Sequence, residues 1–412
     1  MKPAIYLQAM GATSALGTDA ASMRARLFAD EDPAGSASDL DLGRSSCLTV
    51  TQAYSPGRAL FLGCVPPETV LPDLAPLPAI FHSRNNALAA AALEQIRPQI
   101  EDAVQRFGPS RVAVVVGTST SGVQEGETAA HQWVTASSFP DGFDFALQEL
   151  GNTAEFVAHY LGVTGPAYVV STACSSGAKA LAAGARLLQA GWVDAVIAGG
   201  VDALCRFTVS GFSALELVSA TRCNPLSVHR NGINLGEGSA FFLMRRGTES
   251  SIGPIRLAGW GESQDAYHMS APDPQGVGAI AAMQQALGRA GIAAAQVDYV
   301  NLHGTATAHN DAMETLAVNR VLGSEVPVSS TKPLTGHTLA AAGALEAAIA
   351  WHVLYDNASG RLPAHWWDGV ADPGLAAVHP VAPGESLGRG ARYVLSNSFA
   401  FGGSNAALVL AA

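Results

Sequence analysis

The chain has 412 residues, of which 48% are hydrophobic and 14% are charged. This length exceeds one minimal core and predicts two domains or a large fold of duplicated halves. The formal net charge is −11, and the 23 basic residues form no block. The charge pattern therefore argues against a nucleic-acid binder that works by neutralising phosphates.

The cysteine usage predicts a reducing, cytoplasmic setting. An odd number of cysteines without a CxxC pair fits neither a disulfide framework nor a zinc site. The N-terminal stretch 1–17 is interrupted by Gln8 and by glycines, so it predicts a first strand and turn rather than a signal peptide. No apolar stretch is long enough to predict a membrane span. The five cysteines are Cys47, Cys64, Cys174, Cys205 and Cys223.

Short apolar runs alternate with longer Ala-rich segments of helical period. This alternation is typical of an α/β protein with buried sheets. In chain order, the runs that predict strands are 111–117, 166–171, 194–200, 298–304, 326–330 and 392–398.

Two segments far apart in the chain follow the same pattern. The strand at 166–171 is followed by the loop TACSSG and an Ala-rich helix, and the strand at 326–330 is followed by the loop TKPLTGH and another Ala-rich helix. This repeat predicts an internal duplication with halves of 1–250 and 251–412. Two such halves can bring their strand-to-helix loops together at one pocket.

Cys174 lies where a predicted strand ends and a helix begins. Free backbone N–H groups and the positive end of the helix dipole are expected to stabilise a thiolate there and to hold an oxyanion. The alternative is a small, buried core residue, which is the ordinary role of a cysteine beside Ala and Ser. The other four cysteines are assigned that ordinary role.

Further polar residues favour chemistry at Cys174. His303 lies at the end of a predicted buried strand and is followed by small residues, and Lys332 and His337 lie in the loop equivalent to that of Cys174. Glu346 lies on an apolar helix and needs a buried partner, for which Lys332 is the candidate.

Four motifs, STACSSG, HGTAT, STKPLTGH and NSFAFGGSN, occur in this order over nearly the whole chain. Together they resemble the elongating β-ketoacyl-[acyl-carrier-protein] synthases. The resemblance implies the thiolase fold, a five-layered α-β-α-β-α sandwich of two duplicated halves. It also implies a decarboxylative Claisen condensation between malonyl-carrier protein and an acyl chain held as a thioester on Cys174.

The resemblance also assigns roles to single residues. His303 and His337 would stabilise the enolate, while Lys332 and Glu346 would hold this histidine pair. The backbone N–H groups of Cys174 and Phe401 would form the oxyanion hole. Phe401 would also gate the cavity, and Thr305 and Thr307 would bind the pantetheine arm. No metal is implied, and the phosphopantetheine is carried by the acyl carrier protein.

The chain departs from the family pattern at three positions. Ala400 replaces a common glycine, which is expected to restrict the loop before Phe401. Asn231 and Asn301 stand where an aspartate and a glutamate are common. None of the three changes the Cys-His-His set.

Other members of the superfamily remain as alternatives. A chain-length-factor subunit usually lacks the nucleophilic cysteine, and a thiolase has a second catalytic cysteine near its C-terminus, whereas Cys223 is the last cysteine here. An initiating synthase uses Cys-His-Asn rather than two histidines. A structural or binding protein would have no reason to keep the whole constellation.

The stretch HRNGINLGEGSAFFLMRR resembles synthases of bacterial secondary pathways, including aryl-polyene pigment clusters, more than housekeeping fatty-acid enzymes. The implied partners are acyl carrier protein and either a second copy of the chain or a chain-length-factor-like subunit. The sequence carries no clear signature of acyl chain length, saturation or starter unit.

Overall fold

The structure, a computed structural model, describes residues 3–32, 47–247 and 253–412. Within these ranges, a mixed sheet of 11 strands forms the centre, and a two-stranded hairpin lies apart from it. The N-terminal strands of the large sheet are β1 (Ala4–Ser14), β4 (Val112–Gly117), β5 (Ala167–Val170), β6 (Ala195–Asp202) and β7 (Gly238–Gly247). Its C-terminal strands are β8 (Ile255–Gln264), β9 (Tyr299–Asn301), β10 (Pro327–Ser329), β11 (His379–Pro380), β12 (Tyr393–Ala400) and β13 (Ser404–Ala411). The hairpin consists of β2 (Thr49–Thr51) and β3 (Leu60–Leu62).

The large sheet consists of two halves with the same strand order. One half runs β5-β4-β6-β7-β1, and the other runs β10-β9-β12-β13-β8 with β11 beyond β10. In each half the first three strands are parallel and the last two pair antiparallel. The halves join where Tyr6 and Leu7 of β1 pair with β8. The expected boundary at residues 250 and 251 lies outside the described residues.

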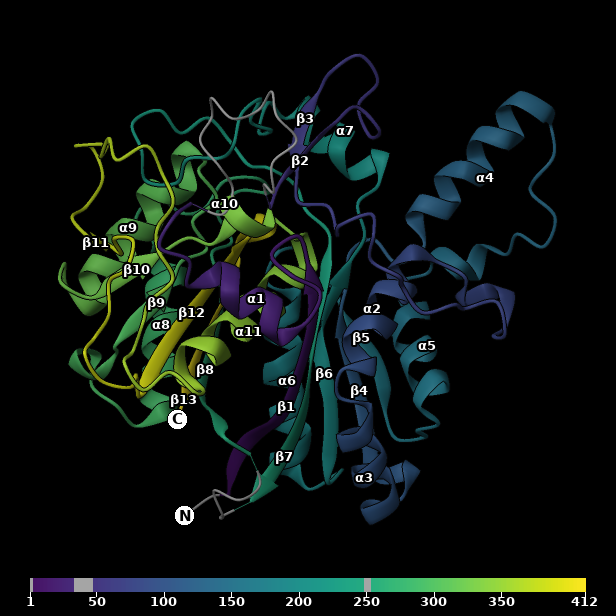
Figure 1. The fold of residues 1–412 in the computed structure, drawn as a ribbon, viewed down its shortest axis with the longest axis horizontal. Coiled ribbons are helices and arrows are strands. Elements are labelled where there is room, and N and C mark those ends of the chain that lie inside the picture. The colour runs from purple at the N-terminus through teal and green to yellow at the C-terminus, as the bar shows by residue number, and fades with distance from the viewer. Residues whose placement is uncertain (1–2, 33–46, 248–252) are drawn as a thin grey trace.

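Helices form three layers around these two half-sheets (Figure 1). Helices α2, α3 and α5 cover the outer face of the N-terminal half, α6 and α11 lie between the halves, and α8 and α9 cover the outer face of the C-terminal half. This α-β-α-β-α arrangement confirms the predicted fold class. The helices are α1 (Ala20–Leu27), α2 (Arg84–Glu94), α3 (Arg97–Phe107), α4 (Val123–Ala136), α5 (Asn152–Leu161), α6 (Ser176–Ala190), α7 (Arg206–Ala214), α8 (Val277–Ala290), α9 (Ala308–Leu322), α10 (Lys332–Thr335) and α11 (Ala342–Leu354).

The central elements are mostly apolar because protein encloses them on every side. All residues of β4 are buried, because helices cover both of its faces. Every residue of α11 is also buried, which is the pattern of a helix enclosed by protein. No helix in the described part of the chain is long and apolar enough to cross a membrane.

Two glycines let the central helices approach closely. A Cβ added to Gly177 of α6 would lie 2.8 Å from the backbone nitrogen of Ala344, and one added to Gly343 of α11 would lie 2.8 Å from that of Ala178. Only glycine fits such backbone contacts without a shift. The close crossing brings the N-terminus of α6 against the C-terminal half of the chain.

Candidate active site

The predicted functional side chains lie beyond the carboxyl ends of parallel strands. Cys174 follows β5, His303 follows β9, and Phe401 follows β12. Lys332 and His337 both follow β10. The carboxyl ends of parallel strands are where ligands bind in many α/β proteins. Both halves of the fold therefore contribute to one site.

Cys174 sits in a tight turn between β5 and α6. Ala173 has a φ of 50°, in the left-handed region that non-glycine residues seldom adopt. Oγ of Ser176 donates to the carbonyl of Ala173 at 2.6 Å and accepts from the backbone N–H of Thr172 at 2.8 Å. These bonds hold the strained turn, which presents the sulfur at the start of α6.

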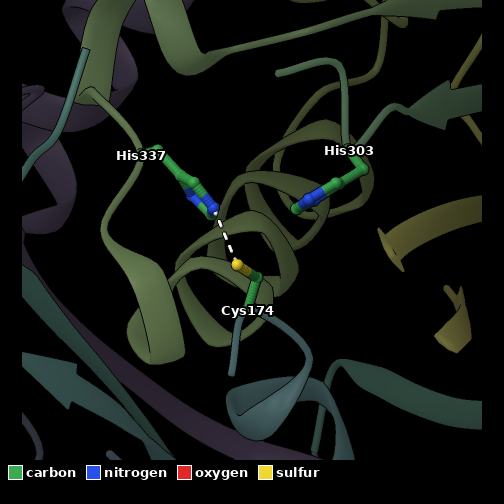
Figure 2. Close-up of side chains that lie close together, drawn as sticks. All are labelled: Cys174, His303 and His337. Carbon is green, nitrogen blue, oxygen red and sulfur yellow. Dashed lines mark hydrogen bonds between the residues drawn. The ribbon is translucent and has the colours of Figure 1, made fainter. Parts of the chain in front are cut away.

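The two predicted histidines face the sulfur (Figure 2). Sγ of Cys174 lies 3.0 Å from Nε2 of His337. The ring centroids of His303 and His337 are 5.3 Å apart, and the sulfur and one nitrogen from each ring lie within 4.8 Å of one another. All three side chains are buried. One small group bound here can therefore contact all three side chains at once.

The sequence-based expectation of a lowered thiol pKa is wrong. Burial raises the pKa of the Cys174 thiol to about 12, although Lys332 and the backbone N–H of Phe401 act in the opposite direction. Burial also lowers the pKa of His337 well below its usual range, as does the positive charge of Lys332. The pair therefore rests as a neutral thiol beside a neutral imidazole. The helix N-terminus could be read from the sequence, but the extent of burial could not.

His303 is neutral for the same reasons. Burial lowers its pKa well below the usual range, and Lys332 and His337 lower it further. A neutral imidazole keeps one N–H donor and one acceptor nitrogen. Both histidines can therefore donate a hydrogen bond into the cavity while carrying no charge.

Two backbone N–H groups point at the sulfur. The N–H of Phe401 and that of Cys174 itself both hydrogen-bond to the sulfur of Cys174, and both bonds favour the thiolate. Donors placed in this way also stabilise an oxyanion that forms on a carbon bonded to the sulfur. These are the two donors expected from the sequence.

Lys332 and Glu346 lie behind the histidines and do not line the cavity. Nζ of Lys332 donates to Oε1 of Glu346 at 2.5 Å and also to the backbone carbonyl of His303. Burial raises the pKa of Glu346 to about 7, and Lys332 opposes that rise. The lysine therefore has the predicted carboxylate partner and holds the backbone at His303.

Two buried carboxyl groups were not anticipated from the sequence. Glu314 accepts hydrogen bonds from the backbone N–H groups of His303 and Gly304, both at 2.7 Å. Asp202 accepts from the backbone N–H of Ala340 at 2.8 Å and so joins β6 to the segment before α11. Glu314 could have been noticed in the sequence as an acidic residue on the apolar face of the helix at 308–322.

The side chains enclose a cavity of about 160 Å³. Its wall includes the catalytic candidates Cys174, His303 and His337, the predicted pantetheine contacts Thr305 and Thr307, and the aromatic residues Phe212, Phe399 and Phe401. The hydroxyls of Thr305 and Thr307 are 2.9 Å apart. The apolar wall and the few polar groups suit a thioester with a flexible, hydrogen-bonding arm.

The structure accommodates the three departures from the family pattern, and the backbone at Ala400 is not strained. Ala400 has extended φ and ψ angles of −102° and 157°, and the positive φ angles fall on Gly402 and Gly403. Asn231 accepts a hydrogen bond from Ser219 Oγ at 2.6 Å. Asn301 is buried and donates to the hydroxyl of Tyr299 at 3.3 Å.

Family models match most of the chain. The β-ketoacyl synthase N-terminal domain matches residues 86–250, and the β-ketoacyl synthase C-terminal domain matches residues 255–360. The 3-oxoacyl-[acyl-carrier-protein] synthase 2 of Rhizobium meliloti (strain 1021) is 36% identical over 268 residues, which are 60% of this chain and 61% of that protein. The enzyme of the same name from Staphylococcus aureus (strain COL) is 31% identical over 77% of this chain and 80% of its own.

Solved structures give the same result over the full length. A structure of a ketosynthase in complex with its chain length factor from Xenorhabdus doucetiae matches with a TM-score of 0.88 and 42% identity, covering 99% of this chain and 98% of that one. A β-ketoacyl synthase from Burkholderia phymatum STM815 matches with a TM-score of 0.82 and 25% identity, covering 99% of both chains. The motifs, the duplicated five-layered fold and these matches agree, and the chain belongs to the β-ketoacyl synthase family.

Proposed function

We propose that the protein is a β-ketoacyl-[acyl-carrier-protein] synthase that joins malonyl-carrier protein to an acyl chain held on Cys174. The observation that carries this proposal is the contact of 3.0 Å between Sγ of Cys174 and Nε2 of His337, with His303 facing the same cavity. A nucleophile, a proton acceptor and paired oxyanion donors are the groups that acyl transfer needs.

In the first step, the acyl chain is transferred from the carrier protein to Cys174. The thiol of Cys174 gives its proton to Nε2 of His337 as Sγ attacks the carbonyl carbon of the acyl thioester. The N–H groups of Cys174 and Phe401 hold the resulting oxyanion. When the intermediate collapses, the pantetheine sulfur leaves and takes the proton from His337. Because the thiol and the imidazole both rest neutral, the proton moves during the attack.

In the second step, malonyl-carrier protein loses CO2. The electrons of the broken C–C bond form an enolate, whose oxygen accepts hydrogen bonds from His303 and from His337, once the single N–H of the neutral His337 ring has moved from Nδ1 to Nε2. The enolate carbon then attacks the thioester carbonyl on Cys174, and the oxyanion again lies at the two N–H groups. The sulfur leaves as a thiolate and takes up one proton from solvent. Neutral imidazoles suit this step because each can donate without first losing a charge.

The substrates and partners follow from the same proposal. Acyl and malonyl groups arrive on the phosphopantetheine arm of an acyl carrier protein, and Thr305 and Thr307 contact this arm. Because the arm belongs to the carrier protein, the synthase itself carries no cofactor. The Cys-His-His cluster has the donor types of a zinc site. However, the charge of Lys332, which already disfavours protonated histidines there, also disfavours a metal cation. We therefore assign the cluster to catalysis.

The pathway and assembly are proposed more specifically. The ketosynthase of Xenorhabdus doucetiae was solved in complex with its chain length factor. By this similarity, we assign the chain a chain-length-factor-like subunit as its partner. The resemblance of residues 229–246 to aryl-polyene synthases supports aryl-polyene synthesis, and the cysteine usage supports a cytoplasmic setting. Because Cys174, His303 and His337 are all present, this chain is the catalytic subunit of the pair and not the chain length factor.

A single-turnover assay tests the proposed chemistry. Enzyme is first acylated on Cys174 and then mixed with malonyl-carrier protein, and CO2 release is followed. Replacing His303 with Ala should slow CO2 release by about 10²–10³-fold, the usual effect of removing one oxyanion donor. The initial acylation of Cys174 should be slowed much less, because His337 and the two N–H groups remain. Unchanged CO2 release would contradict the paired-donor role.

A further inference from the structure

A chain of polar side chains joins helix α6 to the turn that carries Phe401. Lys179 lies on α6, which begins just after Cys174, and Ser404 begins β13 directly after the turn at 401–403. Nζ of Lys179 donates to Oγ of Ser404 at 2.5 Å. Oγ of Ser175, the residue after the nucleophile, lies 3.1 Å from the same oxygen. The hydroxyl of Ser404 is thus held at two points, by Lys179 of α6 and by Ser175 just before that helix.

The turn is packed unevenly, because Gly403 lies closely against Asp265 while Gly402 has open space around it. Gly402 and Gly403 have φ angles of 78° and 74°, and a Cβ added to Gly402 would meet nothing within 4 Å. On its outer side, the backbone N–H of Gly402 donates to the carbonyl of Met269 at 2.7 Å, and Met269 is 79% exposed. The carbonyl of Gly403 also accepts from the backbone N–H of Asp265 at 2.9 Å and from the side chain of Asn405 at 3.3 Å. The contacts on the hydroxyl of Ser404 add to these bonds from the side of the nucleophile.

We propose that Lys179 and Ser404 are positioning residues that fix the N–H of Phe401 against the sulfur of Cys174. The proposal rests on the proposed function, since that N–H is one of the two oxyanion donors. An ammonium group makes a charge-assisted hydrogen bond, which is about twice as strong as a neutral one. Lys179 is half-buried, and its ammonium group reaches a hydroxyl that is buried.

The surroundings of Lys179 supply a matched control. Arg186 lies further along α6 and forms an ion pair with Glu262 of β8. Burial is the largest cause that lowers the pKa of Lys179, and both charges also act on it, since Glu262 raises the pKa and Arg186 lowers it. Replacing Arg186 with Met removes one positive charge from the same helix without touching the turn. The control therefore separates the effect of losing a positive charge on α6 from the effect of moving the turn at 401–403.

The test measures two rates in Lys179→Met, Lys179→Arg, Ser404→Ala and Arg186→Met. The first is acyl transfer to Cys174 at saturating acyl-carrier protein, followed by intact mass. The second is alkylation of Cys174 by iodoacetamide at pH 8, which follows the thiolate fraction and needs no condensing activity. Lys179→Met and Ser404→Ala should each lower both rates by about tenfold, because loss of the Phe401 N–H raises the pKa of the thiol by about one unit. Lys179→Arg should restore most of both rates, and Arg186→Met should leave them unchanged.

The outcomes separate this proposal from the proposed function. The double variant Lys179→Met/Ser404→Ala should be no slower than either single variant, because both residues act through one contact. Additive effects, or a loss in Lys179→Met without one in Ser404→Ala, would overturn the positioning role and indicate a direct effect of charge. A protein that alkylates as expected but forms no acyl adduct would instead refute the proposed function and leave the positioning role standing.

Discussion

The active-site residues are kept neutral by burial rather than charged by their neighbours. The pKa of the Cys174 thiol is raised and those of His303 and His337 are lowered, and in each case burial is the largest cause. Lys332 supplies the positive charge of the site. Its ammonium group lies behind the histidines, away from the cavity, and pairs with Glu346. The site is therefore arranged to stabilise negative charge only when the reaction creates it.

The lowered histidine pKa values predict the pH dependence of decarboxylation. An ordinary histidine becomes protonated as the pH falls through about 6.5. Because the pKa values of His303 and His337 lie well below that value, both rings remain neutral at pH 6. In pre-acylated enzyme, CO2 release should change by less than about twofold between pH 8 and pH 6. A fall in rate with a midpoint near pH 6.5 would show that the histidines are not shifted.

The buried pair of Lys332 and Glu346 makes a prediction about stability. Replacing Lys332 with Met leaves the carboxyl group of Glu346 buried without its partner, which typically costs about 3–5 kcal/mol. Urea unfolding should show this loss. The double variant Lys332→Met/Glu346→Gln should recover much of it, because no charge remains buried. Equal stability of the single variant and the wild type would contradict the assignment of the pair.

At the scale of elements, the crossing of α6 and α11 positions the nucleophile. Replacing Gly343 with Ala places a Cβ 2.8 Å from the backbone nitrogen of Ala178, which forces the helices apart. We expect the free energy of unfolding to fall by about 1–3 kcal/mol. Gly288→Ala in α8 is the control, because its Cβ meets nothing within 4 Å, and alanine favours a helix by up to about 1 kcal/mol. Equal effects of the two changes in thermal unfolding would argue against a close crossing.

Sequence patterns predicted the buried parallel strands well. The runs at 111–117, 166–171 and 194–200 became β4, β5 and β6, and their counterparts at 298–304, 326–330 and 392–398 became β9, β10 and β12. The run at 298–304 was too long, because β9 ends at Asn301 and His303 lies in the loop beyond it. Strand periodicity does not mark where hydrogen bonding stops.

The long strands β7 and β8 were not predicted as strands. Both pair antiparallel with β1, and β8 joins the two half-sheets through that pairing, so their role depends on residues distant in the chain. The supports of the site were missed for the same reason. Glu314 reaches the backbone of His303 only once α9 has folded against the end of β9. Local sequence predicted the side chains that meet at the cavity but not the groups that hold them.

At the scale of the whole molecule, the two duplicated halves supply different groups for the proposed reaction. The N-terminal half supplies Cys174, and the C-terminal half supplies both histidines and the N–H of Phe401. Related strands bring these groups to one end of the two sheets. Neither half contains the full set, so the proposed reaction needs groups from both halves.

The proposed assembly gives a prediction at this scale. Co-expression with a chain-length-factor-like chain should give a one-to-one complex in native mass spectrometry, and Cys174→Ala should leave that complex intact, because the sulfur is buried in the cavity. Full condensing activity from a monomer would contradict the proposed partner.

The most direct measurement is the intact mass of the protein after incubation with an acyl-carrier protein. We predict an increase equal to one acyl group on the wild type and none on Cys174→Ala. Addition of malonyl-carrier protein should then return the wild type to its original mass and yield a 3-ketoacyl product. An adduct that persists in Cys174→Ala, or one that malonyl-carrier protein cannot discharge, would contradict the assignment of Cys174 as the residue that carries the chain.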